Sequence, residues 1–136
     1  MPPIRRILET ALDCNDLPRT AAFYTRLFDV TPMLDSERLV AYDAGEGTVL
    51  LLFQCGAAGD LQTPGGVIPG HDSSGPGHLA FAIDAVTLGE WETRLGSLGI
   101  DIESRVTWPR GGVSLYFRDP DNRLVELVTP GIWPSY

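Results

Sequence analysis

The sequence predicts an α+β fold in which two tandem βαβββ modules form an open, mixed-sheet barrel or cleft. Three observations lead to this prediction. Strand-like and helix-like segments follow one another in the same order in both halves of the chain. The two halves also superpose on matching turns. The length of 136 residues suits one compact domain, 1–136, because it allows a real core but is too short for two ordinary domains.

The first module is expected over about residues 4–55. Asp16 precedes a first-turn Pro18, and apolar residues then recur every three to four positions, which predicts a helix over 18–28. The other elements expected in this half are strands around 7–12, at Leu34, over 39–42 and over 49–53, with a turn at 43–47.

A connecting loop is expected over 56–77, where seven glycines and three prolines leave little to fill a core. The second module, about 78–130, then repeats the order of the first. Its expected elements are a strand over 78–83, a helix over 87–98 closed by Gly99, and strands over 102–107, 113–117 and 124–128.

The repetition extends to individual positions, as expected for an internal duplication. We superposed the turn at 45–47 on the turn at 120–122, and the first strand of each half on the other. This superposition pairs Val49 with Leu124, Leu51 with Glu126, and Glu9 with His78. Two such units can share a cleft, and the cleft is where a functional site is expected.

Composition and charge exclude several classes of protein. Hydrophobic residues make up 43% and charged residues 21% of the chain, as in a folded soluble domain. The net charge of -8 would repel nucleic acid and anionic membranes, so neither is an expected partner. No apolar run suits a membrane span or a signal peptide, so a cytoplasmic location is expected. Two cysteines are too few for a disulfide scaffold.

Polar residues interrupt three apolar strands on equivalent faces. Because side chains alternate along a strand, His78 shares its face with the small Ala80 and Ala82, and Glu9 lies on the corresponding face of the first half. Glu126 lies between apolar residues of the last strand. One imidazole and two carboxylates can bind a divalent metal and leave positions open for water or substrate. Alternatively, each is an ordinary strand residue, exposed or hydrogen-bonded.

Several motifs together resemble those of the vicinal oxygen chelate superfamily, and the resemblance covers nearly the whole chain. They are Leu8-Glu9 seven residues before Asp16-Leu17, Ala22-Phe23-Tyr24, Gly75 to Phe81, Tyr116 to Asn122, and Val125-Glu126-Leu127. The superfamily includes glyoxalase I, fosfomycin-resistance transferases, methylmalonyl-CoA epimerase, extradiol dioxygenases and bleomycin-resistance proteins. The resemblance implies a glyoxalase-like fold.

The resemblance also implies a ligand set for one divalent ion, which would be Mn, Fe, Co, Ni or Zn. The ligands would be Glu9, where relatives usually carry His or Gln, together with His78 and Glu126. Glyoxalase I and the epimerase have a further ligand where this chain has Leu51. Glu126, or alternatively Glu9, would be the catalytic group that moves a substrate proton.

Candidate substrate-binding residues lie on the second module. Ser114 and Tyr116 match positions that contact substrate in the fosfomycin-resistance branch, although Tyr116 also suits a half-buried strand aromatic. Trp108 and Arg110 lie in an expected hairpin loop, where they could border the cleft.

Two functions are therefore considered. The first is a metal-dependent enzyme that acts on a small oxygen-rich substrate by lyase, isomerase or dioxygenase chemistry, with the metal as a Lewis acid that stabilises an oxyanion. The resemblance implies a homodimer. The alternative is a metal-free, bleomycin-resistance-like protein that sequesters a small molecule. The acidic charge and the stacking surfaces of Trp108, Tyr116 and Trp133 suit that alternative.

Overall fold

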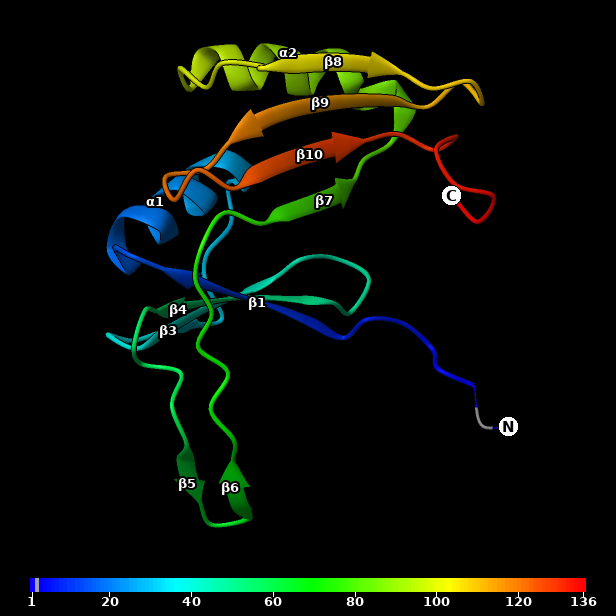
Figure 1. Ribbon diagram of the computed structural model, residues 1–136. Coiled ribbons are helices and arrows are strands. Elements are labelled where there is room, and N and C mark those ends of the chain that lie inside the picture. The colour runs from blue at the N-terminus through cyan, green and yellow to red at the C-terminus, as the bar shows by residue number, and fades with distance from the viewer. Residues whose placement is uncertain (2) are drawn as a thin grey trace. The chain divides into compact units, whose positions relative to one another are not determined.

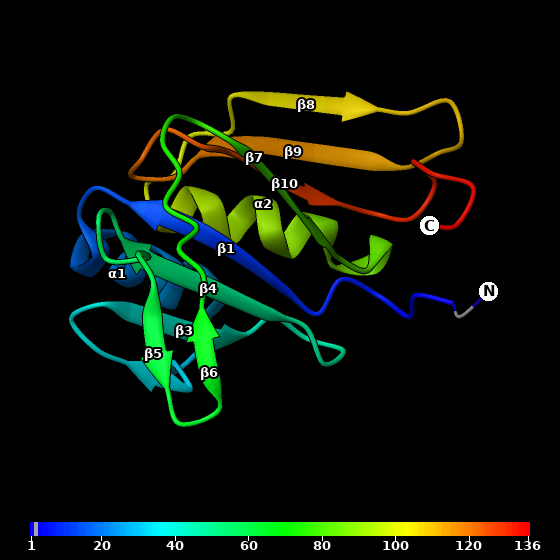
Figure 2. The same ribbon diagram turned by 60° about the horizontal axis from the view of Figure 1, so that its bottom comes forward.

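The computed structural model describes Met1 and residues 3–136, which form two compact units, Met1–Gly75 (unit 1) and Pro76–Tyr136 (unit 2). Among these described residues, each unit contains one four-stranded sheet and one α-helix (Figures 1 and 2). The α+β fold class predicted from the sequence is confirmed. No helix in this part of the chain is long and apolar enough to cross a membrane.

Unit 1 has a four-stranded sheet in the order β1-β4-β3-β2 and a separate hairpin, β5-β6. Strand β1 runs parallel to β4, and the other neighbours are antiparallel. The elements are β1 (Glu9–Cys14), α1 (Leu17–Phe28), β2 (Leu34–Asp35), β3 (Leu39–Asp43), β4 (Val49–Gln54), β5 (Leu61–Thr63) and β6 (Gly66–Ile68).

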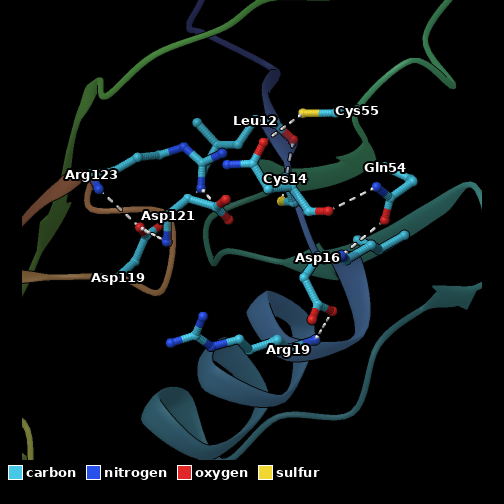
Figure 3. A network of polar contacts seen from close by, with 11 residues as sticks. Leu12, Cys14, Asp16, Arg19, Gln54, Cys55, Asp119, Asp121 and Arg123 are labelled. Atoms are coloured by element: carbon cyan, nitrogen blue, oxygen red, sulfur yellow. Dashed lines mark hydrogen bonds and ion pairs between the residues drawn. The ribbon is translucent and has the colours of Figure 1, made fainter.

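Local sequence explains where helix α1 begins and ends. The Asp16 carboxylate accepts a hydrogen bond from the backbone N–H of Arg19 at 3.0 Å, which caps the helix N-terminus (Figure 3). Asp29 ends the helix in the left-handed conformation, with φ at 54°. Helix α1 packs on β3 and β4, and it buries the side chains of Leu17, Tyr24 and Leu27. The helix predicted over 18–28 is therefore confirmed, with one more residue at its start.

Unit 2 has a sheet in the order β7-β10-β9-β8, again with one parallel pair, β7 and β10. The elements are β7 (His78–Ala82), a 3-10 turn η1 (Ala85–Thr87), α2 (Leu88–Ser97), β8 (Ser104–Thr107), β9 (Val113–Arg118) and β10 (Leu124–Val128). The helix expected over 87–98 thus starts as a 3-10 turn. The core contains side chains without solvent exposure, namely Leu95, Leu115, Phe117, Val125 and Leu127.

The two sheets have the same order and the same register. In unit 1, Glu9 pairs with Val49, just as His78 pairs with Leu124 in unit 2. Likewise, Leu51 pairs with Ala41 on the antiparallel neighbour, as Glu126 pairs with Tyr116. These pairings agree with the positions superposed from the sequence, so each strand pair of one sheet has a counterpart in the other.

The segment 56–77 is more ordered than the expected loop. It contains the hairpin β5-β6, in which Leu61 pairs with Ile68, and the Thr63 hydroxyl donates to the Gly66 carbonyl at 2.7 Å across the turn. Gly66 takes a φ of 138°, which a residue with a side chain rarely adopts. Glycine here forms a tight turn between two short strands rather than an open connection.

Candidate functional site

Four predicted site residues lie on one face of the unit 2 sheet. Glu126 is in β10 directly opposite Tyr116 of β9. His78 of β7 is opposite Leu124, two residues before Glu126, and Ser114 of β9 is opposite Val128, two residues after it. Since residues two apart share a face, all four side chains project from the same side. The opposite side carries the apolar core residues of the same strands.

His78 has a fixed orientation. Its Nδ1 lies 3.0 Å from the backbone carbonyl oxygen of Leu124, and its Nε2 lies 3.1 Å from Oε2 of Glu126. A carbonyl oxygen can only accept, so the hydrogen of the neutral ring resides on Nδ1. The Nε2 lone pair then faces a carboxylate oxygen. Two acceptors at this distance need either a proton or a metal ion between them.

The Glu126 carboxylate is buried and held at both oxygens. Its side chain is 4% exposed, whereas that of His78 is 49% exposed. The hydroxyl of Ser114, which is fully buried, donates to Oε1 of Glu126. A buried carboxylate requires such partners to offset its loss of hydration. Oε2 is the oxygen directed at the more exposed His78 ring.

Tyr116 borders this pair. Its ring centroid lies 6.3 Å from that of His78, and the planes are tilted by 36°. Burial raises the pKa of the Tyr116 hydroxyl above its ordinary value, the hydrogen bond with Ser114 opposes this rise, and the Glu126 charge adds to it. The phenol is therefore neutral near pH 7 and can donate a hydrogen bond beside the carboxylate.

The His78 and Glu126 side chains fit a shared divalent ion. Two ligand atoms that bind one ion at about 2.1 Å and at right angles lie about 3.0 Å apart. The distance from Nε2 to Oε2 is 3.1 Å. Within the described residues, no group of three His, Cys, Asp or Glu side chains is close enough to hold a metal. The pair would therefore supply two donors to an ion, and a complete site would need a further one.

The other predicted site residues occupy different places. Glu9 is exposed at the first position of β1 in unit 1. Trp108 and Arg110 lie in the hairpin between β8 and β9, where Arg110 is exposed and Trp108 is half-buried. The Trp108 indole N–H donates to the Ser114 hydroxyl at 2.7 Å, so this N–H points into the site rather than to solvent. The roles predicted for Glu9, Trp108 and Arg110 remain predictions.

The turn between β9 and β10 sets the register on which the site depends. Asp119 Oδ1 accepts from the backbone N–H groups of Asp121 and Arg123, each at 2.9 Å. The buried Arg123 guanidinium donates to Asp119 Oδ2 at 2.8 Å (Figure 3). Asn122 takes a positive φ of 62°, as the tight turn requires. This turn places Tyr116 opposite Glu126.

Sequence reasoning missed the connection from Ser114 to Glu126 and the backbone acceptor for His78. The alternation of side chains placed these residues on equivalent faces but did not say which strands are neighbours. A signal was available in the hairpin, because counting outward from a five-residue turn at 119–123 places Tyr116 opposite Glu126, with Ser114 two residues away.

Comparison with known proteins places the chain in a large family. The sequence-family model described as the Glyoxalase/Bleomycin resistance protein/Dioxygenase superfamily matches residues 6–127 of this chain. The metallothiol transferase FosB of Bacillus licheniformis is 28% identical over 120 residues, which cover 88% of this chain and 71% of that protein. The fosfomycin resistance protein FosX of Listeria innocua is 43% identical over 51 residues, covering 37% of this chain and 38% of that protein.

Solved structures show the same fold. The crystal structure of lactoylglutathione lyase from Agrobacterium tumefaciens superposes with a TM-score of 0.87 and 34% identity, covering 98% of this chain and 99% of that one. FosX from Listeria monocytogenes superposes with a TM-score of 0.64 and 21% identity, covering 97% and 96%. The second likeness concerns the fold alone.

Proposed function

Because the chain belongs to the Glyoxalase/Bleomycin resistance protein/Dioxygenase superfamily, we propose that it is a metal-dependent enzyme acting on a small oxygen-rich substrate. The metal ligands in this proposal are His78, Glu126 and Glu9. One observation carries it: with Nδ1 of His78 bound to a carbonyl, Nε2 faces Oε2 of Glu126 at 3.1 Å. A divalent ion between these two acceptors would satisfy both of them.

The donor set suits one ion of Mn, Fe, Co, Ni or Zn, since imidazole and carboxylate bind hard and borderline metals. When bound, such an ion acts as a Lewis acid that stabilises negative charge on a substrate oxygen. Glu126, whose Oε1 accepts a hydrogen bond from the Ser114 hydroxyl, would be the group that takes a substrate proton. Glu9 is the alternative group for that proton. The neutral Tyr116 hydroxyl would bind and orient a substrate oxygen.

Lyase or isomerase chemistry is the first class to test. The similarity to a lactoylglutathione lyase at 34% identity over nearly the whole chain supports it. Dioxygenation remains a second class within the family. The similarity to FosB at 28% identity supports including fosfomycin and thiols among the substrates tested. A homodimer is part of the proposal and is checked by the mass of the protein in solution.

The experiment is elemental analysis of protein purified without chelator or nickel, with three variants. We expect about one divalent ion per chain in the wild type, as the single proposed site requires. The His78→Ala and Glu126→Gln variants should lose it. His71→Ala is the matched control, because His71 is the other histidine of the chain and its ring instead contacts Phe53, with centroids 4.7 Å apart.

Two outcomes would contradict the proposal. One is a wild-type protein that holds no metal and takes up no added Mn, Fe, Co, Ni or Zn. The other is a His78→Ala variant that binds metal as tightly as the wild type. The first outcome would favour the metal-free binding protein, which would then be tested by thermal stabilisation with cationic aromatic compounds.

A further inference from the structure

A continuous chain of hydrogen bonds runs from Trp108 to His78. The Trp108 indole N–H donates to the Ser114 hydroxyl oxygen at 2.7 Å, and that hydroxyl donates to Oε1 of Glu126. Oε2 of the same carboxylate lies 3.1 Å from Nε2 of His78, whose Nδ1 is bound to the Leu124 carbonyl at 3.0 Å. Ser114 has no solvent exposure, so solvent does not compete for its two hydrogen bonds in the folded protein.

The direction of this chain is determined by Trp108. An indole N–H is a donor only, so the Ser114 oxygen must accept from it. A hydroxyl has a single hydrogen, and that hydrogen is then available for Glu126. The Tyr116 hydroxyl also hydrogen-bonds with Ser114, but of these two partners the indole is the one that cannot accept the Ser114 hydrogen. The indole therefore directs the Ser114 hydrogen to Oε1 of Glu126.

The hairpin that carries Trp108 is itself held in place. The backbone N–H of Trp108 donates to the Gly112 carbonyl at 2.8 Å, and the backbone N–H of Gly111 donates to the Trp108 carbonyl at 2.9 Å. The next residue, Val113, donates its backbone N–H to the Thr129 hydroxyl at 2.8 Å. A side chain supported in this way has its orientation set before any ligand binds.

We propose that Trp108 is a positioning residue: through Ser114 it orients the Glu126 carboxylate so that Oε2 is presented to His78 and to an ion that both bind. The metal part of this inference rests on the proposed function. The hydrogen-bonded chain itself lies within unit 2 and involves no metal, so it can be tested separately.

The first test is a double-mutant cycle with Mn²⁺ as the probe. Trp108→Phe and Ser114→Ala should each weaken Mn²⁺ binding by about ten- to hundredfold, the range seen when a ligand loses its supporting hydrogen bond. If Trp108 acts only through Ser114, the affinity of the double variant for Mn²⁺ should equal that of the single variant with the lower affinity. Trp133→Phe, which changes a tryptophan that is 66% exposed, should bind Mn²⁺ like the wild type.

The second test uses metal-free protein and ¹⁵N NMR of the His78 ring and the Trp108 indole. The indole N–H of the wild type should be protected from exchange with solvent, and Ser114→Ala should remove the protection. Trp108→Phe should also shift the His78 Nε2 signal, whereas Trp133→Phe should not. A loss of packing alone would lower the melting temperature without moving that signal.

These outcomes separate the two proposals. A wild-type protein that binds no metal contradicts the proposed function, while the NMR signals still decide the role of Trp108. Additive effects in the cycle, or a His78 signal unchanged in Trp108→Phe, would overturn the inference. If Trp108→Phe does not fold, an unchanged His78 signal in Ser114→Ala overturns it just as well, because Ser114 is the required intermediate.

Discussion

Glu126 and Leu51 occupy equivalent positions in the two sheets. Each is the third residue of its strand, and each pairs with an alanine of the parallel neighbour, Ala80 for Glu126 and Ala11 for Leu51. The same local backbone thus accommodates a carboxylate in unit 2 and an apolar side chain in unit 1. The carboxylate is not needed to form the sheet, which points to a role other than folding.

Glu126→Leu, which copies the unit 1 residue, should therefore separate binding from stability. The half-exposed His78 regains water when the carboxylate is removed, so the main loss is the acceptor of the buried Ser114 hydroxyl. We expect the variant to fold with a melting temperature lowered by several degrees, which corresponds to about 1–3 kcal/mol. Metal content, measured by elemental analysis, should fall to background. Glu126→Ala, which leaves a cavity, should be less stable than Glu126→Leu.

A Glu126→Leu variant that keeps its metal would contradict the ligand role. A variant that unfolds at a much lower temperature would instead show that the carboxylate supports the fold through Ser114 and His78. Circular dichroism on the same samples distinguishes a folded, metal-free variant from an unfolded one.

The phenol of Tyr42 joins strand β3 to helix α1. It is 3% exposed, its hydroxyl donates to the Ala21 carbonyl at 2.9 Å, and it lies 3.1 Å from the Thr25 hydroxyl. Tyr42→Phe removes these bonds and should lower the free energy of unfolding by about 1 kcal/mol at pH 7, as measured by urea denaturation.

The Tyr42 hydroxyl should also make the free energy of unfolding depend on pH. Burial, the largest cause, raises the pKa of the Tyr42 hydroxyl in the folded protein above its ordinary value. The folded state therefore holds the proton more tightly than the unfolded state, and the stabilising contribution is complete below about pH 10. It is lost as the pH rises through the folded value. The stability difference between wild type and Tyr42→Phe should shrink above about pH 10, and a constant difference would contradict this assignment.

A close backbone approach favours glycine at Gly112. A Cβ at this position would lie 2.7 Å from the Gly131 carbonyl carbon, which belongs to backbone and cannot easily move. Gly112→Ala should destabilise the protein by about 1–3 kcal/mol, the usual cost of overpacking. Gly96→Ala is the matched control, since Gly96 is in helix α2 and nothing lies within 4 Å of its added Cβ. That variant should gain about 0.5–1 kcal/mol. Thermal unfolding measures both.

Sequence reasoning succeeded where local patterns decide the structure. Asp16 and Pro18 marked the start of α1, and the superposed positions Glu9 and His78 do occupy equivalent registers. It did not predict the β5-β6 hairpin within the segment 56–77, because two strands of three residues are stabilised by turn geometry and cross-strand bonds rather than by an apolar period. It also missed the bond from Ser114 to Glu126, since side-chain rotamers depend on which strands pair.

The segment after the β5-β6 hairpin is tied to strand β1 through Ser73. Both the backbone N–H and the hydroxyl of Ser73 donate to Oδ2 of Asp13, at 2.7 and 2.6 Å. Asp13 shares its strand face with Glu9, so the tether acts on the strand that carries the proposed third ligand. Ser73→Ala removes the hydroxyl bond and leaves the backbone bond.

We expect several-fold faster hydrogen exchange at the amide of residue 73 in this variant, because an exposed tether opens locally rather than with the whole unit. Amides of β4 should exchange as in the wild type, and the melting temperature should change little. Equal acceleration in β4 would show that the Ser73 bonds support the whole sheet of unit 1, and unchanged exchange at Ser73 would show that its hydroxyl does not hold the segment.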